Sequence, residues 1–309
     1  MKNRLSAKIY WETLYVLFAF ALFSPGLVFA QQVRVVATWP ALADITKQIG
    51  KELVSVDSLA TGVEDPHGVP MKPSFVPRLN RADALVLIGL DDEHAWIPAL
   101  LEVAGNPKIL LGRPGYIDCS VGVPVLEAPA LVDRSEGDLH PKGNPHYLLD
   151  PVRAKIAARN IAVGLSRIFP QHQQVFDKNL KAYTADLDTW IDRWEKMTAP
   201  LRGLKFVEYH PEWVYLADRF GMKRIGSVEL KPGIEPTPNH IVDLVQQIKQ
   251  EKARLLIYGA QNPRVPQQIS NETGIKVLRL YSGGGNGPET DSYIKWIDYT
   301  VRTLIQAAS

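Results

Sequence analysis

The chain has 309 residues, of which 46% are hydrophobic, and its 35 Lys and Arg nearly balance its 33 Asp and Glu. This balance argues against a nucleic-acid partner held by bulk positive charge. Its one cysteine, Cys119, cannot form an internal disulfide, and a thiolate metal centre needs more cysteines. Any metal site must therefore use imidazole and oxygen ligands.

The first thirty residues have the pattern of an export signal. Three basic residues lie within the first eight positions, an apolar run extends from Leu14 to Phe23, and Val28-Phe29-Ala30 provides a cleavage site. A single membrane anchor is the alternative, but the apolar run is shorter than the roughly 20 residues that span a bilayer. We therefore expect residues 1–30 to be a signal peptide cleaved near Ala30, and the rest of the chain to be soluble and periplasmic.

The chain before residue 170 alternates short apolar runs with amphipathic stretches, which is typical of βαβ units and a mainly parallel sheet. Ser74 stands where a helix N-cap belongs. The expected strands cover Val33–Ala37, Val54–Leu59, Ala84–Ile88 and Lys108–Leu111, and the expected helices cover Ala41–Ile49, Ser74–Arg81 and His94–Val103.

The same alternation returns after residue 197. Thr237-Pro238 is a strong helix start, because a capping hydroxyl precedes a proline at the first helical position. The expected strands cover Lys205–Tyr209, Arg224–Val228, Arg254–Tyr258 and Lys276–Leu280, and the expected helices cover Glu212–Phe220, Pro238–Lys252, Val265–Thr273 and Thr290–Ala307.

A long amphipathic segment lies between the two halves. Its apolar residues recur in steps of three and four, which places them on one face of a helix about 40 Å long. A coiled-coil seam is the alternative, but sustained heptads with flanking charges are not clearly present. The sequence therefore predicts an α/β protein with two lobes, residues 31–169 and 198–309, joined by a rigid connector helix over residues 170–197. The apolar residues of the connector are Phe176, Leu180, Tyr183, Leu187, Trp190, Trp194 and Met197.

Three histidines stand in similar places relative to these elements. His67 follows the second strand, His146 precedes the helix that opens at Asp150-Pro151, and His210 ends the first strand of the second lobe. Loops at the carboxyl ends of parallel strands line the ligand crevice of open α/β sheets, and a proline beside each histidine restricts its backbone. Three neutral imidazoles suit zinc. On spacing alone, ordinary surface histidines remain an equal alternative.

Several short motifs occur in a characteristic order along the chain. They are Val35–Asp44 (VVATWPALAD), Asp65-Pro66-His67, Ala82–Val86 (ADALV), Gly137–Pro141 (GDLHP), Asn144–Pro151 (NPHYLLDP), Gly233–Pro238 (GIEPTP) and Glu272-Thr273-Gly274. With them, the chain resembles the metal-binding proteins of zinc and manganese ABC importers, the cluster A-I periplasmic solute-binding family. The resemblance implies that His67, His146 and His210 occupy the three histidine ligand positions, and that a membrane permease of the ABC class is the partner.

The chain departs from the family at the fourth ligand. Family members usually place an acid after the last strand, where this chain has Tyr281, and a phenol with a pKa near 10 is a poor ligand at neutral pH. Water, Glu64 or an acid brought in by the loop 282–287 can complete the metal's coordination instead. His140 is a candidate accessory or entry-path ligand.

Two further acids and one further histidine are weaker candidates for a role in metal binding. Glu229 and Glu235 flank a Pro-Gly turn and are candidates for orienting a ligating imidazole. For His94, beside three acidic residues, a solvated helix start is favoured over a second weak metal site.

These patterns favour a monomeric, non-enzymatic binding protein that carries zinc, with Mn²⁺ or Fe²⁺ as the alternative metal, because manganese prefers oxygen donors. A zinc hydrolase or lyase is the competing class, since three histidines and an open position also describe a catalytic site. No HExxH motif places a general base beside the metal. An adhesion protein of the same fold is the third reading.

Overall fold

The computed structural model describes residues 32–128, 140–229 and 233–309. The predicted signal peptide and residues 137–139 of the GDLHP motif lie outside these ranges. Within the described residues, no helix is both long enough and apolar enough to cross a membrane.

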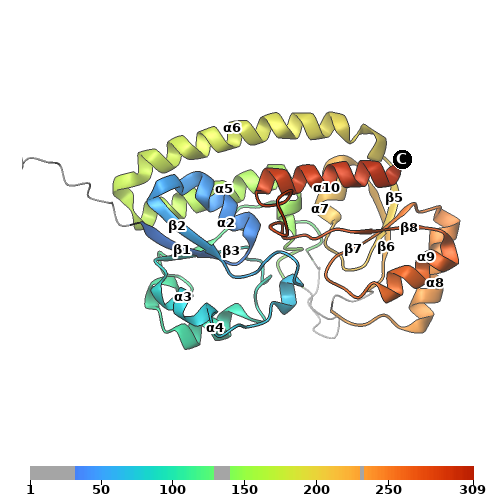
Figure 1. Ribbon diagram of the computed structural model, residues 1–309, viewed down its shortest axis with the longest axis horizontal. Helices are drawn as coiled ribbons and strands as arrows, with labels where there is room; N and C mark the ends of the chain where they lie inside the picture. Colours follow the sequence, from blue (N-terminus) through green and yellow to red (C-terminus); the bar gives the residue numbers. More distant parts are fainter. Residues whose placement is uncertain (1–31, 129–139, 230–232) are drawn as a thin grey trace, which may run out of the picture. The chain divides into compact units, whose positions relative to one another are not determined.

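The first lobe is built on a four-stranded parallel sheet with the strand order β2-β1-β3-β4. Its strands are rich in β-branched and other apolar residues, which suits strands that helices cover on both faces. Figure 1 shows α3 and α4 on one side of this sheet and α2 and α5 on the other. The elements are β1 (Val33–Ala37), α2 (Pro40–Gly50), β2 (Val54–Ser58), α3 (Phe75–Arg81), β3 (Ala84–Leu87), α4 (Ile97–Ala104), β4 (Tyr116–Asp118) and α5 (Pro151–Ile168).

The fourth strand was predicted in the wrong place. Residues Pro107–Ile109 form a 3-10 turn, and the strand that pairs with β3 follows at Tyr116–Asp118. The side chain of Asn106 explains the difference, because it accepts a hydrogen bond from the Lys108 amide (3.1 Å) and donates to two carbonyls of the first lobe. This capping favours a helical turn over an extended strand.

The second lobe repeats the plan of the first. Its parallel sheet has the order β6-β5-β7-β8, so in both lobes the first strand lies inside the sheet between the second and third. The two-lobed α/β fold predicted from the sequence is confirmed. The elements are β5 (Lys205–Glu208), α7 (Val214–Phe220), β6 (Lys223–Ser227), α8 (Pro238–Glu251), β7 (Leu255–Tyr258), α9 (Arg264–Thr273), β8 (Lys276–Arg279) and α10 (Tyr293–Ala308).

A long helix, α6 (Gln173–Met197), joins the lobes, as the spacing of its apolar residues predicted. Figure 1 shows it running past α2 and α5 of the first lobe to the second lobe, with α10 beside it. The indole nitrogen of Trp194 donates to Asp298 of α10 (3.1 Å), so the far end of the connector is tied to the C-terminal helix. The buried face of α6 consists of Phe176, Tyr183, Leu187, Ile191 and Trp194.

The C-terminal helix α10 returns to the first lobe. The Tyr293 amide donates to Asp44 of α2 (2.8 Å), and the Tyr293 hydroxyl donates to the carbonyl of Leu148 (2.7 Å). One continuous apolar core includes residues of both sheets, α6 and α10. A shared core and two helices that contact both lobes leave little freedom for the lobes to move apart.

The connector can be tested through Trp194, whose side chain is fully buried. Trp194→Ala should lower the free energy of unfolding by about 3–5 kcal/mol, because it leaves a large cavity in the shared core. Val175→Ala, at an exposed position of the same helix, should change it by less than about 0.5 kcal/mol. Urea unfolding of both variants measures the difference, and equal stabilities would contradict a packed connector.

Candidate metal centre

His67 lies on a short 3-10 turn, Pro66–Gly68, after β2. The Asp65 side chain caps this turn by accepting from the His67 amide (2.9 Å). The preceding loop is held by Glu64, whose carboxylate accepts from the amides of Thr61 (2.9 Å) and Gly62 (3.1 Å). Glu64 therefore stabilises the conformation of the loop that carries His67.

His146 lies in a loop that both lobes hold. The Asn144 side chain accepts from the His146 amide (3.0 Å) and donates to the carbonyl of Pro211 in the second lobe (2.8 Å). The hydroxyl of Tyr215, on α7, donates to the Asn144 carbonyl (2.6 Å). The loop of His146 is thereby fixed to the chain segment that carries His210.

His210 follows β5 and has a carboxylate partner. Its Nδ1 lies 2.8 Å from Oε2 of Glu229, which also accepts from the amide of Gly233 (3.1 Å). This is the imidazole-orienting contact that the sequence suggested for Glu229 or Glu235. Glu235 itself is exposed. Burial raises the pKa of Tyr209 to about 12, and the charges of Glu235 and Glu229 add to this shift.

The three histidines converge on one point. One ligand atom from each lies within 4.8 Å of the others, and all three side chains are buried. Nε2 of His67 lies 3.3 Å from Nε2 of His210. Two nitrogens bound at about 2.0–2.1 Å to one tetrahedral zinc ion are about 3.3–3.4 Å apart. The separation of these two atoms therefore has the dimension of one edge of a zinc site.

The hydrogen bonds of the rings determine which nitrogens carry lone pairs. Nδ1 of His67 faces the carbonyl oxygen of Asp92 (3.3 Å), and Nδ1 of His210 faces the Glu229 carboxylate. Both of these oxygens accept, so each Nδ1 carries the proton and each Nε2 is the ligand nitrogen. Two lone pairs at this distance repel each other unless a proton or a cation lies between them.

Electrostatics favour different protonation states for the three rings. Burial, together with the neighbouring imidazoles, holds the pKa of His67 and His146 well below the usual range. Burial also lowers the pKa of His210, but its hydrogen bond to Glu229 and the charges of Glu212 and Asp65 outweigh burial and raise the pKa to about 9. Of the three rings, His210 is therefore the one that favours a proton near neutral pH.

Two buried acids near the histidines were missed from the sequence. Glu212 has an Oε1 atom without a hydrogen-bond partner, and burial raises the pKa of its carboxyl to about 7. Asp92 has an unpartnered Oδ2, and burial raises its pKa well above the usual range. The position of Glu212 two residues after His210 was the available signal. Asp92 was hidden in an acidic run that resembled a solvated helix start.

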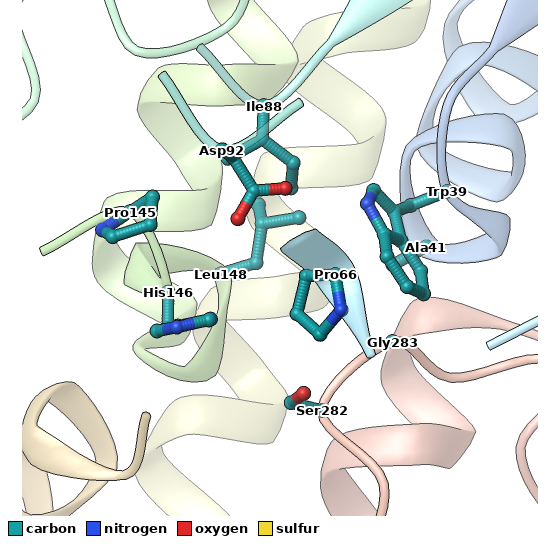
Figure 2. A pocket seen from close by; sticks show the side chains of 10 residues that line it. All are labelled: Trp39, Ala41, Pro66, Ile88, Asp92, Pro145, His146, Leu148, Ser282 and Gly283. Carbon is teal, nitrogen blue, oxygen red and sulfur yellow. The ribbon is translucent and has the colours of Figure 1, made fainter. Parts of the chain in front are cut away.

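A cavity beside His146 is lined by residues that follow several of the strands. Figure 2 shows the Trp39 indole, the Asp92 carboxyl, the His146 ring and Ser282 around it. Ser282 belongs to the loop after β8, and its hydroxyl hydrogen-bonds to the Glu212 carboxyl and so lowers that pKa. Ser282 and Gly283 are thus the residues of this loop that line the cavity, and Tyr281 is not among them.

Tyr281 and His140, the other candidate ligands, have different surroundings. The Tyr281 ring lies against the guanidinium of Arg279, 5.0 Å from it, while its carbonyl accepts from Trp296. The His140 ring contacts the His67 ring, with 4.7 Å between centroids. Among the described His, Cys, Asp and Glu residues, only His67, His146 and His210 have ligand atoms that group around one point, so neither His140 nor Glu64 joins them.

Glycines allow the loop after β8 to lie on the loop after β2. A Cβ atom on Gly62, whose φ is +91°, would come within 1.5 Å of the Gly284 carbonyl oxygen. A Cβ atom on Gly283 would meet the Trp39 ring at 2.5 Å. The backbone of the second lobe thus packs directly against the loop that carries His67.

An ion pair holds the His146 loop from its other end. Asp150 is fully buried, caps α5 by accepting from the Val152 amide, and pairs with Arg153 of α5 and with Arg219 of α7 (2.8 Å). Because Arg219 belongs to the second lobe, this pair crosses between the lobes. Arg224 forms a second link between the lobes, because it pairs with Glu208 of the second lobe and with Glu127 of the first.

The chain matches a known protein family along most of its length. The sequence model of the family described as "Zinc-uptake complex component A periplasmic" matches residues 35–307. The chain belongs to this family. The resemblance inferred from the sequence motifs is therefore confirmed.

Individual relatives in this family are named for different metals. The manganese ABC transporter substrate-binding lipoprotein PsaA of Streptococcus pneumoniae is 27% identical over 287 residues, which is 89% of each chain. The high-affinity zinc uptake system protein ZnuA of Bacillus subtilis is 25% identical over 280 residues, covering 88% of this chain and 86% of that protein. A crystal structure of ZnuA matches with a TM-score of 0.76 at 25% identity, over 90% of this chain and 100% of that one. These relatives are binding components of transporters and not enzymes, which agrees with the binding class over the hydrolase or lyase.

The ion pair at Asp150 gives a test of how the His146 loop is held. Asp150→Asn keeps a capping oxygen but leaves two guanidinium groups without their shared charge, and should cost about 2–4 kcal/mol in the free energy of unfolding. The matched control is Asp218→Asn, since Asp218 is half-exposed and contacts the same Arg153. It should change stability by less than about 0.5 kcal/mol. Thermal unfolding distinguishes the two, and equal effects would contradict the account.

Proposed function

We propose that this protein is the substrate-binding component of a metal ABC importer. It captures one divalent transition metal with His67, His146 and His210 and delivers it to a membrane permease. Export, with removal of residues 1–30, puts the protein in the periplasm, where its cargo and the outer face of the permease are found. The proposal rests on one observation. The Nε2 atoms of His67 and His210 lie 3.3 Å apart, and the Nδ1 atom of each ring faces a hydrogen-bond acceptor.

Zinc is the proposed cargo. The ligands are neutral nitrogens from three imidazoles, a set that zinc accepts in tetrahedral geometry and that manganese, with its preference for oxygen, accepts less well. The names of the relatives include both metals, so this preference rests on the ligand set of this chain. The fourth position falls to water, because the Glu64 carboxylate is occupied by Thr61 and Gly62 and Tyr281 lies against Arg279.

The burial of the site is consistent with a protein that carries a metal ion and does not catalyse a reaction. The three side chains are at most 8% exposed, which leaves little room for a substrate beside the metal. The ligands come from loops of both lobes, so a bound metal ties the lobes together and its loss loosens them. The shared core and α6 favour local rearrangement at the loops over wide hinge closure.

The direct test is metal titration of the exported protein after metal removal. Zinc, manganese and iron are titrated separately into the wild type and into His67→Ala, His146→Ala and His210→Ala. Zinc should bind most tightly to the wild type, and each substitution should weaken it by more than about 100-fold, the upper limit for loss of a supporting group alone. His172→Ala, at a histidine outside the site, is the control. Unchanged zinc affinity in the three site variants would overturn the proposal.

Zinc affinity should also depend on pH. The pKa of His210 is raised to about 9, so a proton competes with the metal for its Nε2 at every lower pH. Apparent affinity should fall about tenfold for each unit that the pH drops below that value, because one proton is displaced per metal bound. Isothermal titration calorimetry in buffers of different ionisation enthalpy counts this proton. Metal binding without proton release at pH 7 would contradict the assignment of Nε2 as the ligand atom.

A further inference from the structure

Five of the seven histidines form one continuous chain of ring contacts. We call His67, His146 and His210 the triad. The centroids of its three ring pairs lie 5.1, 5.4 and 5.6 Å apart, and two more rings extend this cluster outward. His140 lies 4.7 Å from His67, and His94 lies 6.3 Å from His140. His94 is exposed, His140 is half-buried and His67 is buried. The chain of rings therefore leads from solvent to the metal centre.

Three of these rings are held by three successive carbonyl groups. Nδ1 of His94 faces the carbonyl of Asp91 (2.8 Å), Nδ1 of His67 faces that of Asp92 (3.3 Å), and the His140 ring is hydrogen-bonded to the carbonyl of Leu90. The turn after β3 presents these carbonyls in sequence.

The backbone of this turn is unusual. Gly89, Leu90 and Asp91 all have positive φ, at 82°, 54° and 63°. For leucine this conformation is costly, and such strain persists only where the surrounding structure enforces it. The turn is anchored at its far end by Glu93, which accepts from the amides of Ile88 and Gly89.

Each hydrogen bond to a carbonyl leaves one ring nitrogen as a lone pair. The carbonyl accepts, so the bonded nitrogen carries the proton and the other is a metal donor. In His140 that other nitrogen is Nε2, which is buried and has no hydrogen-bond partner. Leaving a buried acceptor without a partner is unfavourable, and this nitrogen is free to bind a cation.

We propose that His94 and His140 form an outer metal-binding site, which takes a divalent transition metal from solvent and passes it inward to His67. The inference rests on the proposed function of the triad, because the outer site has no use without an inner one. It departs from the view that His94 is a solvated helix start.

The distances suit a stepwise exchange of ligands. Within the triad, rings that are arranged to share one ion have centroids 5.1–5.6 Å apart, and His140 lies within that distance of His67. His94 needs to approach by about 1 Å, which a rotation of an exposed side chain supplies. Asp91, exposed beside these rings, adds a negative charge that attracts the incoming cation. Because one turn holds three of the rings, the metal moves inward without separation of the lobes.

The outer site can be isolated by removing the inner one. A variant with His67, His146 and His210 all changed to Ala should still bind one zinc ion weakly, and addition of His94→Gln should abolish that binding. Adding His172→Gln instead, at a ring outside the chain, should leave the weak binding intact. Cobalt, as a spectroscopic probe, reports the same loss through its d–d absorption. If the triple variant binds no zinc, or if His94→Gln does not reduce its binding, the outer site is wrong while the triad is unaffected.

The relay is tested by rates in the otherwise intact protein. His94→Gln and His140→Gln should slow both zinc association and zinc release by roughly tenfold, the scale on which supporting groups act at metal sites. Because both rates fall together, the dissociation constant should move much less than either rate. Stopped-flow competition with a zinc-sensitive dye measures both, with His172→Gln as the control. Unchanged rates in His94→Gln, or a change in dissociation rate alone, would overturn the relay.

Discussion

The opposed Nε2 atoms of His67 and His210 are the interaction on which the rest of the structure depends. Their Nδ1 atoms are held by the Asp92 carbonyl and the Glu229 carboxylate, so their lone pairs must face each other at 3.3 Å. In a buried site, where the effective dielectric constant is low, that repulsion is relieved only by a shared proton or a cation. In the proposed mechanism, a proton at His210 relieves this repulsion in the metal-free protein, and a bound metal takes the place of that proton.

Holding two lone pairs in this arrangement requires a rigid support, and the fold provides it from both lobes. The repeated strand order places the ligand loops at the carboxyl ends of the strands. Asn144, Tyr215 and the pair of Asp150 with Arg219 fasten the His146 loop to the second lobe, while α6 and α10 contact both lobes. The three proposed ligands are thus held in place by contacts within the protein, which reduces the free energy of ordering that the proposed metal binding must overcome.

Much of this could be predicted from the sequence because the signals are local. Runs such as Val33–Ala37 and Ala84–Leu87 combine β-branched residues with strand length, and the apolar steps of α6 allow only one buried face. The three histidines that converge in the structure were singled out by their place at strand ends and by family resemblance. Their role as metal ligands stays a prediction. The position of the fourth strand was predicted wrongly, because Asn106 stabilises a turn through contacts with residues more than twenty positions away.

The buried acids, and the contact between the rings of His94 and His140, escaped prediction for a different reason. Charged residues are usually exposed, so nothing in the sequence marks Glu212 and Asp92 as the buried acids that the structure shows them to be. His94 lies 46 residues before His140 in the sequence, and only the fold brings their rings together. The left-handed turn at Leu90 has no sequence signal of its own, because Gly89 and Asp91 tolerate positive φ but leucine does not favour it.

The most direct measurement of the central claim is X-ray absorption spectroscopy at the zinc edge on the metal-loaded protein. The account predicts a four-coordinate zinc ion with three imidazole nitrogens at about 2.0–2.1 Å and one oxygen. Multiple scattering from the imidazole rings counts the histidines independently of any variant. A shell with fewer than three imidazoles, or a six-coordinate oxygen shell, would contradict the convergence of His67, His146 and His210 on one metal.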